Sequence, residues 1–224
     1  MGGRCHDGAM EFDGHILGAS FASGDRIVVG RWLRSPFGSF ADVMWCRSDG
    51  RRVLLAPDER VRDFLAGHYA FDELRVERVT AERTGDGAIV GSAGPVRLTL
   101  RPSGPGWASR LLALRPRGIR TAKAWIDLED RVLRPLVRPL FAAADVRTSG
   151  VTLAGTRERY AIHDFRHAEA TASVDGVDLG PTALCAPAGF GFSEFPSTAA
   201  LVRVTSMFEG DAAAETVSGR SRGG

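Results

Sequence analysis

The chain has 224 residues, of which 44% are hydrophobic and 25% are charged, the balance of an ordinary globular protein. This composition excludes a disordered, collagen-like or disulfide-scaffold chain, and the length is enough to form a core without a metal or crosslink. Lysine and arginine together number 29 against 27 acidic residues, so the net charge of +2 creates no strong field for capturing nucleic acid or a membrane surface.

The set of polar residue types is narrow. Lys123 is the single lysine, and the sequence contains no asparagine and no glutamine. Codon bias explains so one-sided a choice of cation, so the many arginines alone do not indicate a phosphate-binding protein. The missing amides have a firmer consequence: polar contacts to a buried ligand must come from the backbone or from hydroxyl, indole, imidazole or charged side chains.

Cysteine usage and hydropathy indicate a cytoplasmic protein. Cys5, Cys46 and Cys185 are too few and too scattered for a disulfide framework or a metal knuckle. The N-terminal segment contains charges throughout and no apolar stretch of about 7–15 residues, so no secretory signal is expected. No apolar run approaches the roughly 18 residues of a spanning helix, so no transmembrane segment is expected.

Aspartate–glycine pairs punctuate the chain and predict β-hairpins. Such pairs accept the positive φ angles of a type I′ turn, whose twist matches that of two paired strands. Asp49-Gly50 separates the run 40–46 from the run 52–55. Asp86-Gly87 and Asp175-Gly176 separate runs in the same way, and Gly24-Asp25, a type II′ candidate, joins the run 16–23 to the run 26–32. Four turns of this kind predict a mostly antiparallel β protein.

The strand-like runs differ in how many faces they bury. The run 96–100 alternates apolar and polar residues, which is typical of a strand with one face on the core. The runs 27–32 and 43–46 are apolar on both faces, and each contains a tryptophan. Both of their faces need cover, which predicts an antiparallel meander forming a barrel or half-barrel whose interior is filled or holds a ligand.

Two regions show helical patterns. The segment near 58–67 follows Pro57, begins with two acids and ends at Gly67, as a short helix does. The region near 107–144 has apolar residues at helical spacing with charged residues opposite, and it predicts an amphipathic surface helix that Pro135 and Pro139 kink or end. The expected fold class is therefore mainly β (α+β), with a short helix and a helical insert.

We expect a single domain over residues 10–209, in which the strands on either side of the insert share one core. Its parts are an N-terminal β region (10–104), the helical insert (105–145) and a C-terminal β region (146–209). Strands in the last region are expected at 151–161, 168–174, 190–195 and 201–208. Segments 1–9 and 210–224 are expected to be flexible tails. Two subdomains divided near the insert are the alternative.

The sequence shows no motif for a metal, a cofactor or a catalytic nucleophile. The densest titratable patch is 163–167, where His163 and His167 would lie about 13 Å apart along a strand, too far to share one metal. No serine-hydrolase elbow, phosphate loop or dinucleotide fingerprint is present. Lys123 lies on the charged stripe of the insert, where it should stay protonated rather than act as a nucleophile. We expect no metal and no cofactor.

The helical insert is rich in positive charge. Segment 101–139 contains nine basic residues against three acidic ones. This pattern fits weak contact with an anionic membrane surface or an acidic partner, although a solvated helical face is the simpler interpretation. The aromatic pattern of an RNA-binding sheet and a zinc finger are both missing, so no nucleic acid partner is expected.

Aromatic residues in or beside the expected strands indicate a small-molecule cavity, with ordinary core packing as the alternative. The candidate ligand-binding residues are two tryptophans and the polar groups available to orient a guest: Trp32, Trp45, Arg31, Tyr160, His163 and Glu194. The meanders and tryptophan-bearing strands are similar to those of lipocalin-type ligand carriers, whose N-terminal Gly-x-Trp signature is absent here. This resemblance lies at the level of the fold, which does not define a function.

The leading hypothesis is a protein that binds an apolar or amphipathic small molecule in a β-barrel-like cavity. The second is an enzyme that uses a histidine and a carboxylate in the same cavity, with His163, Asp164 and Glu194 as candidate acids or bases. The third is an interaction module that acts through the basic insert.

Overall fold

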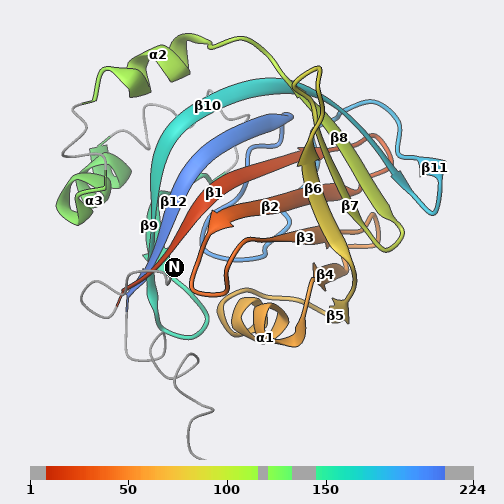
Figure 1. Cartoon of the computed structure of the whole chain (residues 1–224), viewed down its shortest axis with the longest axis horizontal. Helices are drawn as coiled ribbons and strands as arrows, with labels where there is room; N and C mark the ends of the chain where they lie inside the picture. Colours follow the sequence, from red (N-terminus) through yellow and green to blue (C-terminus); the bar gives the residue numbers. More distant parts are fainter. Residues whose placement is uncertain (1–8, 116–120, 133–144, 210–224) are drawn as a thin grey trace, which may run out of the picture.

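A computed structural model describes residues 9–115, 121–132 and 145–209 (Figure 1). Its elements are β1 (Ala9–Ser20), β2 (Arg26–Arg34), β3 (Phe40–Cys46), β4 (Arg52–Ala56), α1 (Glu59–His68), β5 (Glu73–Val76), β6 (Val79–Arg83), β7 (Ile89–Ala93), β8 (Val96–Pro102), α2 (Trp107–Ala113), α3 (Lys123–Val132), β9 (Ser149–Val151), β10 (Arg157–Val174), β11 (Val177–Asp178) and β12 (Ala200–Glu209).

The strands form one curled sheet in the order β5-β4-β3-β2-β1-β12-β10-β8-β7-β6, with β9 and β11 paired to β10. The sheet is a half-barrel, with β10 arching over it (Figure 1). The described pairs are antiparallel except β4 and β5, which are parallel because α1 connects them as a crossover. The expectation of a mainly β half-barrel with a short helix near 58–67 and helices in the insert is confirmed.

The four glycine-containing turns all join antiparallel neighbours, as predicted, but their conformations differ. At Asp175-Gly176 both residues have positive φ, 51° and 79°, which is the type I′ pattern. At Asp49-Gly50 only Gly50 does, with φ of 84°, and its amide donates to the Arg47 carbonyl at 2.9 Å. This is the three-residue hairpin loop with one glycine in the left-handed region, and the turns at Gly24 and Gly87 follow it.

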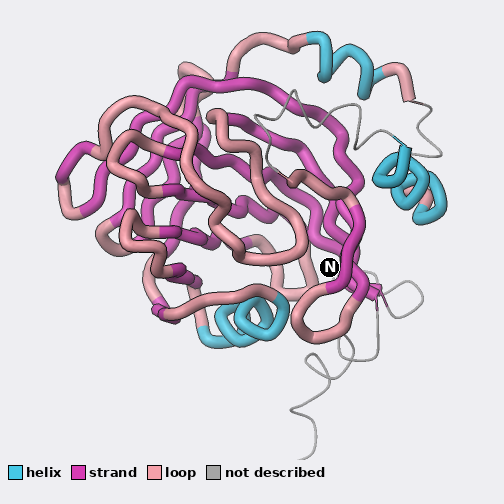
Figure 2. The backbone as a smooth tube through the Cα atoms, turned by 180° about the vertical axis from the view of Figure 1, so that it is seen from behind, coloured by secondary structure: helices cyan, strands magenta, loops and turns pink. Residues whose placement is uncertain are grey.

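The strands β1–β4 are buried on both faces. One face packs against β6, β7 and β8, and its core contains Leu17, Val29, Val43, Leu55, Leu98 and Leu100. The opposite face packs against α1 and the C-terminal strands through a second cluster that includes Phe12, Trp32, Leu54, Phe64, Val204 and Phe208. Figure 1 shows β6–β8 crossing over β1–β4, and Figure 2 shows a long connection crossing from behind.

The long strand β10 contributes side chains to both clusters, because a bulge reverses the alternation of its side chains between the two faces. Glu158, Tyr160 and Ile162 face the second cluster, and the pairing register with β12 then shifts between Ile162 and Asp164. Beyond the bulge, Phe165 faces the second cluster while Ala172 packs into the first. Segments 151–161 and 168–174, expected as two strands, are therefore joined in one strand from 157 to 174, preceded by the short β9.

The segment 190–195 is not a strand, contrary to expectation. Backbone amides near this segment bond to a side chain rather than to a neighbouring strand: the Glu194 carboxylate accepts from the amides of Ala188 and Gly189, at 3.1 and 2.7 Å.

The insert also differs from the single helix expected, because α2 and α3 are separate helices. Its remaining parts, 116–120 and 133–144 with Pro135 and Pro139, lie outside the described residues, as do tails 1–8 and 210–224, whereas Ala9 already belongs to β1.

Helix α1 begins where the sequence indicates. Asp58 caps it, because its side chain accepts a hydrogen bond from the Val61 amide at 2.9 Å, and Glu59 places a negative charge in the first turn. Val61, Phe64, Leu65 and His68 form its buried face. The helix therefore presents Phe64 to the second cluster and positions Tyr69, its C-terminal cap, beside the interior.

The first cluster gives a test of the two-layer packing. Leu98 is fully buried in it, so Leu98→Ala should lower the free energy of unfolding by about 2–5 kcal/mol. Leu184→Ala is the control, because Leu184 is 69% exposed and its truncation should change stability by no more than about 0.5 kcal/mol. Urea unfolding at equilibrium measures both, and equal effects would contradict the packing of β8 on β1–β4.

Candidate functional site

A cavity of about 280 Å³ lies on the concave side of the half-barrel, against the face of β1–β4 that is turned away from β6–β8. Its volume is close to the lower end of the roughly 300–1,000 Å³ range of small-molecule sites. Most of the wall is aromatic or aliphatic, from β1, β2, β3, α1, β10, β12 and the segment 190–196: Phe12, Ile16, Val28, Trp32, Phe40, Met44, Phe64, Tyr160, Ile162, Phe165, Phe190, Phe195, Val202, Val204 and Phe208.

The structure brings three of the six candidate ligand-binding residues together at this cavity: Trp32, Tyr160 and Glu194. The other three lie elsewhere because neighbouring residues of a strand point to opposite faces. Arg31, next to Trp32, donates from Nε to the carbonyl of Ala81 in β6, at 2.9 Å.

Trp45 and His163 also lie away from the cavity. Trp45 packs in the first cluster, donates from Nε1 to Asp25 Oδ1 at 2.8 Å, and borders a second cavity of about 300 Å³. His163 sits at the bulge of β10, where its Nε2 lies 2.9 Å from Thr205 Oγ1. The enzyme hypothesis therefore loses its proposed histidine, and Asp164, which pairs with Arg166 at 2.7 Å, does not line the cavity either.

Trp32 is fixed by a buried acid in the cavity wall. Its Nε1 donates to Asp42 Oδ1 at 2.9 Å, across neighbouring strands. Gly30 lies directly opposite Asp42 in the sheet, two residues before Trp32. A Cβ at this position would overlap both partners, so only glycine leaves room for the hydrogen bond. Burial raises the pKa of Asp42 to about 6, against the opposing effect of the Trp32 hydrogen bond.

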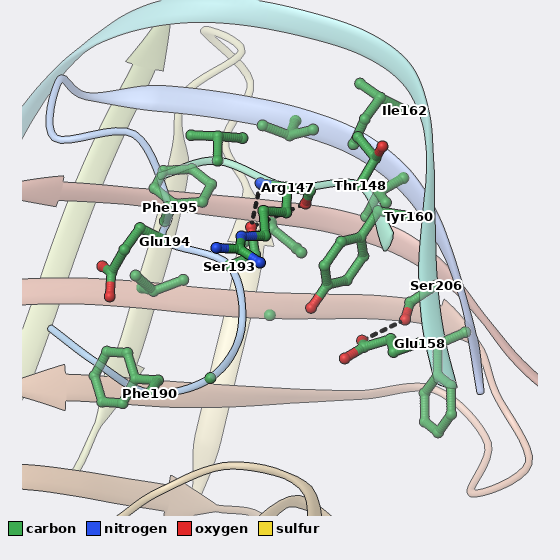
Figure 3. A pocket seen from close by; sticks show the side chains of 18 of the residues that line it. Arg147, Thr148, Glu158, Tyr160, Ile162, Phe190, Ser193, Glu194, Phe195 and Ser206 are labelled. Atoms are coloured by element: carbon green, nitrogen blue, oxygen red, sulfur yellow. Dashed lines mark hydrogen bonds between the residues drawn. The ribbon is translucent and has the colours of Figure 1, made fainter. Parts of the chain in front are cut away.

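The polar end of the cavity is built around Glu158, which lies on β10 and is wholly buried. Its Oε1 accepts hydrogen bonds from the hydroxyls of Tyr69 and Ser206, at 2.6 and 2.7 Å. The hydroxyls of Tyr69 and Tyr160 lie 3.2 Å apart, so the two phenols and the carboxyl form a continuous chain. Glu158 Oε2 is buried without a hydrogen-bond partner, and Figure 3 shows Glu158 and Tyr160 pointing into the cavity from β10.

Burial controls the protonation of this cluster. It raises the pKa of Glu158 from its usual 4.5 to about 7, although the neighbouring hydroxyls, Tyr69 first, act in the opposite direction. Burial and the neighbouring carboxylate also hold the pKa values of both tyrosines well above the usual 10.0. Near neutral pH the tyrosines are therefore neutral, and Glu158 is the group that changes charge.

A segment of the β11–β12 connection covers this polar end. Phe192 stacks on Tyr160 with ring centroids 5.6 Å apart, and its ring lies so close to Gly150 that a Cβ there would overlap it. The segment is held by Glu194, whose carboxylate pairs with the buried Arg26 at 3.1 Å. Arg26 also donates to the Phe195 carbonyl. Glu194 thus lines the cavity but already has partners for both oxygens.

Several charged side chains of the insert form ion pairs. Arg115 and Glu129 form an ion pair at 2.7 Å, and Trp125 Nε1 donates to the same carboxylate. Lys123 pairs with Glu209 at 2.6 Å. Part of the positive charge that suggested an interaction surface is therefore neutralised within the chain. The arginines at 117, 120, 134 and 138 lie outside the described residues.

The sequence interpretation missed Glu158, Tyr69, Ser206 and Asp42. A signal exists for the two acids, since Asp42 interrupts an apolar strand and Glu158 alternates with Tyr160 and Ile162. Tyr69 follows α1, and only the folded chain brings it to β10.

The sequence matches no protein-family model and no curated protein. Within the described ranges, no group of three or more histidine, cysteine or acidic side chains is arranged to hold a metal ion. Among the helices in the described part of the chain, none has the length and apolar character needed to span a bilayer.

The raised pKa of Glu158 predicts a specific dependence of stability on pH. Between its usual 4.5 and about 7 the folded state keeps the proton while the unfolded state releases it. The free energy of unfolding should therefore fall as pH rises through this window, by roughly 3 kcal/mol from this group. Glu158→Gln removes this contribution, so the difference between wild type and variant in urea unfolding should change by that amount between about pH 4.5 and 8.

The control is Glu82→Gln, which changes an exposed acid on β6 and should leave the wild-type profile in place. Asp42 contributes equally to wild type and Glu158→Gln, so it cancels in the comparison. A constant difference between these two proteins at every pH would contradict the burial of an ionisable Glu158.

The ion pair that holds the covering segment gives a second test. Glu194→Ala leaves Arg26 buried without its counter-charge, so it should lower the free energy of unfolding by about 3–5 kcal/mol. It should also accelerate proteolytic cleavage within 180–199. Glu169→Ala, at an exposed position of β10, is the matched control and should leave both quantities near wild type. Unchanged proteolysis in Glu194→Ala would refute the role of this ion pair.

Proposed function

We propose that this protein binds a small amphipathic molecule in the concave cavity, with the apolar part of the guest against the aromatic wall and its polar end at the Glu158 cluster. The observation that supports this most directly is the state of Glu158: one oxygen has two hydrogen-bond donors, and the other is buried beside the cavity with none. An unsatisfied buried polar atom costs free energy, and a guest that bonds to it recovers that cost.

The shape and lining of the cavity support the same function. Its wall is largely apolar, with a few polar groups gathered at one end, the usual arrangement of sites that bind and orient small molecules. Phe12, Phe64 and Phe208 pack as a preformed group, with ring centroids 5.1–5.3 Å apart. A preformed wall lowers the entropy that binding must otherwise overcome.

A second candidate function, an enzyme, is favoured by one observation. Glu158 has a pKa of about 7, the range in which a carboxyl both gives and takes a proton efficiently at neutral pH, and it is linked to two phenols. The acid–base residue would then be Glu158 rather than His163 or Asp164. Recovery of a guest that is chemically changed by wild type and unchanged by Glu158→Gln would favour this function over binding alone.

Binding in the cavity is tested by filling it. Ile162 is half-buried and lines the cavity, so Ile162→Trp should weaken binding of phenylbutanol at least about tenfold, which corresponds to roughly 1.4 kcal/mol. Leu184→Trp adds the same ring at an exposed position and should bind like wild type. Isothermal titration calorimetry measures the affinities, and native mass spectrometry of the protein from its own host would reveal a retained guest.

Circular dichroism and thermal unfolding establish whether Ile162→Trp remains folded. Equal affinities of a folded Ile162→Trp variant and wild type would place the binding site elsewhere. Failure of wild type to bind phenylbutanol and its amine and carboxylate analogues, together with no retained mass in the native protein, would refute the proposed function.

A further inference from the structure

The described lining of the cavity is acidic in a protein whose overall net charge is +2. Two arginines, Arg115 and Arg147, meet five acidic side chains there: Asp42, Glu129, Asp130, Glu158 and Glu194. The walls around them are largely apolar, so these charges are poorly screened by water. Acidic side chains therefore outnumber basic ones in the described lining, against the sign of the whole molecule.

The acids differ in how their charge is balanced. Glu194 pairs with Arg26 at 3.1 Å, and Glu129 pairs with Arg115 at 2.7 Å. Asp130 accepts from the Thr148 amide at 2.7 Å. Glu158 and Asp42, the two buried in the wall, are bonded to neutral donors: hydroxyls for Glu158 and an indole for Asp42. These two carboxyls therefore lack the counter-charge that buried acids normally have.

Several aromatic side chains neighbour Glu158 in the cavity wall. Phe208 lies directly opposite it on β12, and Phe12 and Phe64 pack on Phe208. Tyr160 lies next on the same face, stacked with Phe192. The faces of aromatic rings carry negative partial charge and attract cations, and cages of such rings recognise substituted ammonium groups.

We propose that the guest of this cavity is an organic cation, an amphipathic amine whose ammonium group binds at Glu158 among the rings of Tyr69, Tyr160 and Phe208. This inference rests on the proposed function and names the chemical class of the guest. The ammonium donates to Glu158 Oε2, the buried oxygen without a partner, and supplies the missing positive charge. A neutral guest with an acceptor oxygen would satisfy Oε2 only when Glu158 is protonated, and it would gain nothing from the ring faces.

Among the titratable groups near the site, Asp42 in the β3 wall also changes charge in this pH range, since burial raises its pKa to about 6, and the comparison of wild type with Glu158→Gln separates its effect from that of Glu158. Tyr69 and Tyr160 have pKa values raised well above 10.0. The buried His68 at the end of α1 has a lowered pKa, because burial opposes its charge, and its Nδ1 lies 2.8 Å from the Phe64 carbonyl. From the covering segment and the rim, Glu194, Arg115 and Arg147 are held by ion pairs, the last with Asp145 at 2.7 Å.

The test compares three probes with one apolar body: phenylbutylamine, phenylbutanol and phenylbutyrate. Isothermal titration with the full chain at about pH 8, where Glu158 is ionised, should give an affinity for the amine at least about tenfold above that for the alcohol, with the carboxylate weakest. Lowering the pH to about 5.5 protonates Glu158 and should remove most of the preference. Glu158→Gln should bind the alcohol like wild type and lose the amine preference at pH 8, whereas Glu169→Gln should keep it.

The outcomes separate this inference from the proposed function. An alcohol that binds as tightly as the amine to wild type overturns the organic-cation inference and leaves the binding function in place. A folded Glu158→Gln variant that keeps the amine preference also overturns it. If none of the three probes binds wild type, both proposals fail. The wild-type comparison requires no variant, so instability of Glu158→Gln does not remove the test.

Discussion

Burial of β1–β4 on both faces is the constraint on which the rest of the structure depends. A strand in an ordinary antiparallel sheet turns one side to water, but these strands alternate between two interiors. Leu17, Val29 and Val43 face a core that is filled by β6–β8, and residues between them on the same strands form part of the cavity wall. The side chains of one face therefore provide packing, which frees those of the other face to shape a site.

Local signals made the architecture predictable, whereas long-range pairing decided the site. Turns such as Asp175-Gly176 depend on a few adjacent residues, so the hairpins were readable from the sequence. Two-sided apolar runs likewise indicated a half-barrel. Arg31 and Trp32 could not share a cavity, since they are adjacent on one strand, and the alternation already showed this. The meeting of Tyr69 with Glu158 depends on the position of α1 against β10, which no local pattern specifies.

Burial of Glu158 departs from what stability alone would favour. An acid whose only partners are hydroxyls opposes folding at the pH where it ionises, and a hydrophobic side chain would fit the same apolar surroundings at lower cost. Such local conflicts are typical of functional sites, where the scaffold offsets a group kept for another purpose. Here the scaffold includes the Glu194–Arg26 pair, which holds the segment whose Phe192 stacks on Tyr160.

The bulge of β10 reverses which side chains, even-numbered or odd-numbered, face the cavity in the two halves of the strand. Upstream of Asp164, even-numbered positions such as Glu158 and Tyr160 point to the cavity, and downstream even-numbered positions such as Ala172 point to the other core. A chain that lost or gained one residue at this point would exchange the two environments over half the strand. The insertion that forms the bulge thus lets one continuous strand contribute both to the wall of the cavity and to the layer formed by β6–β8.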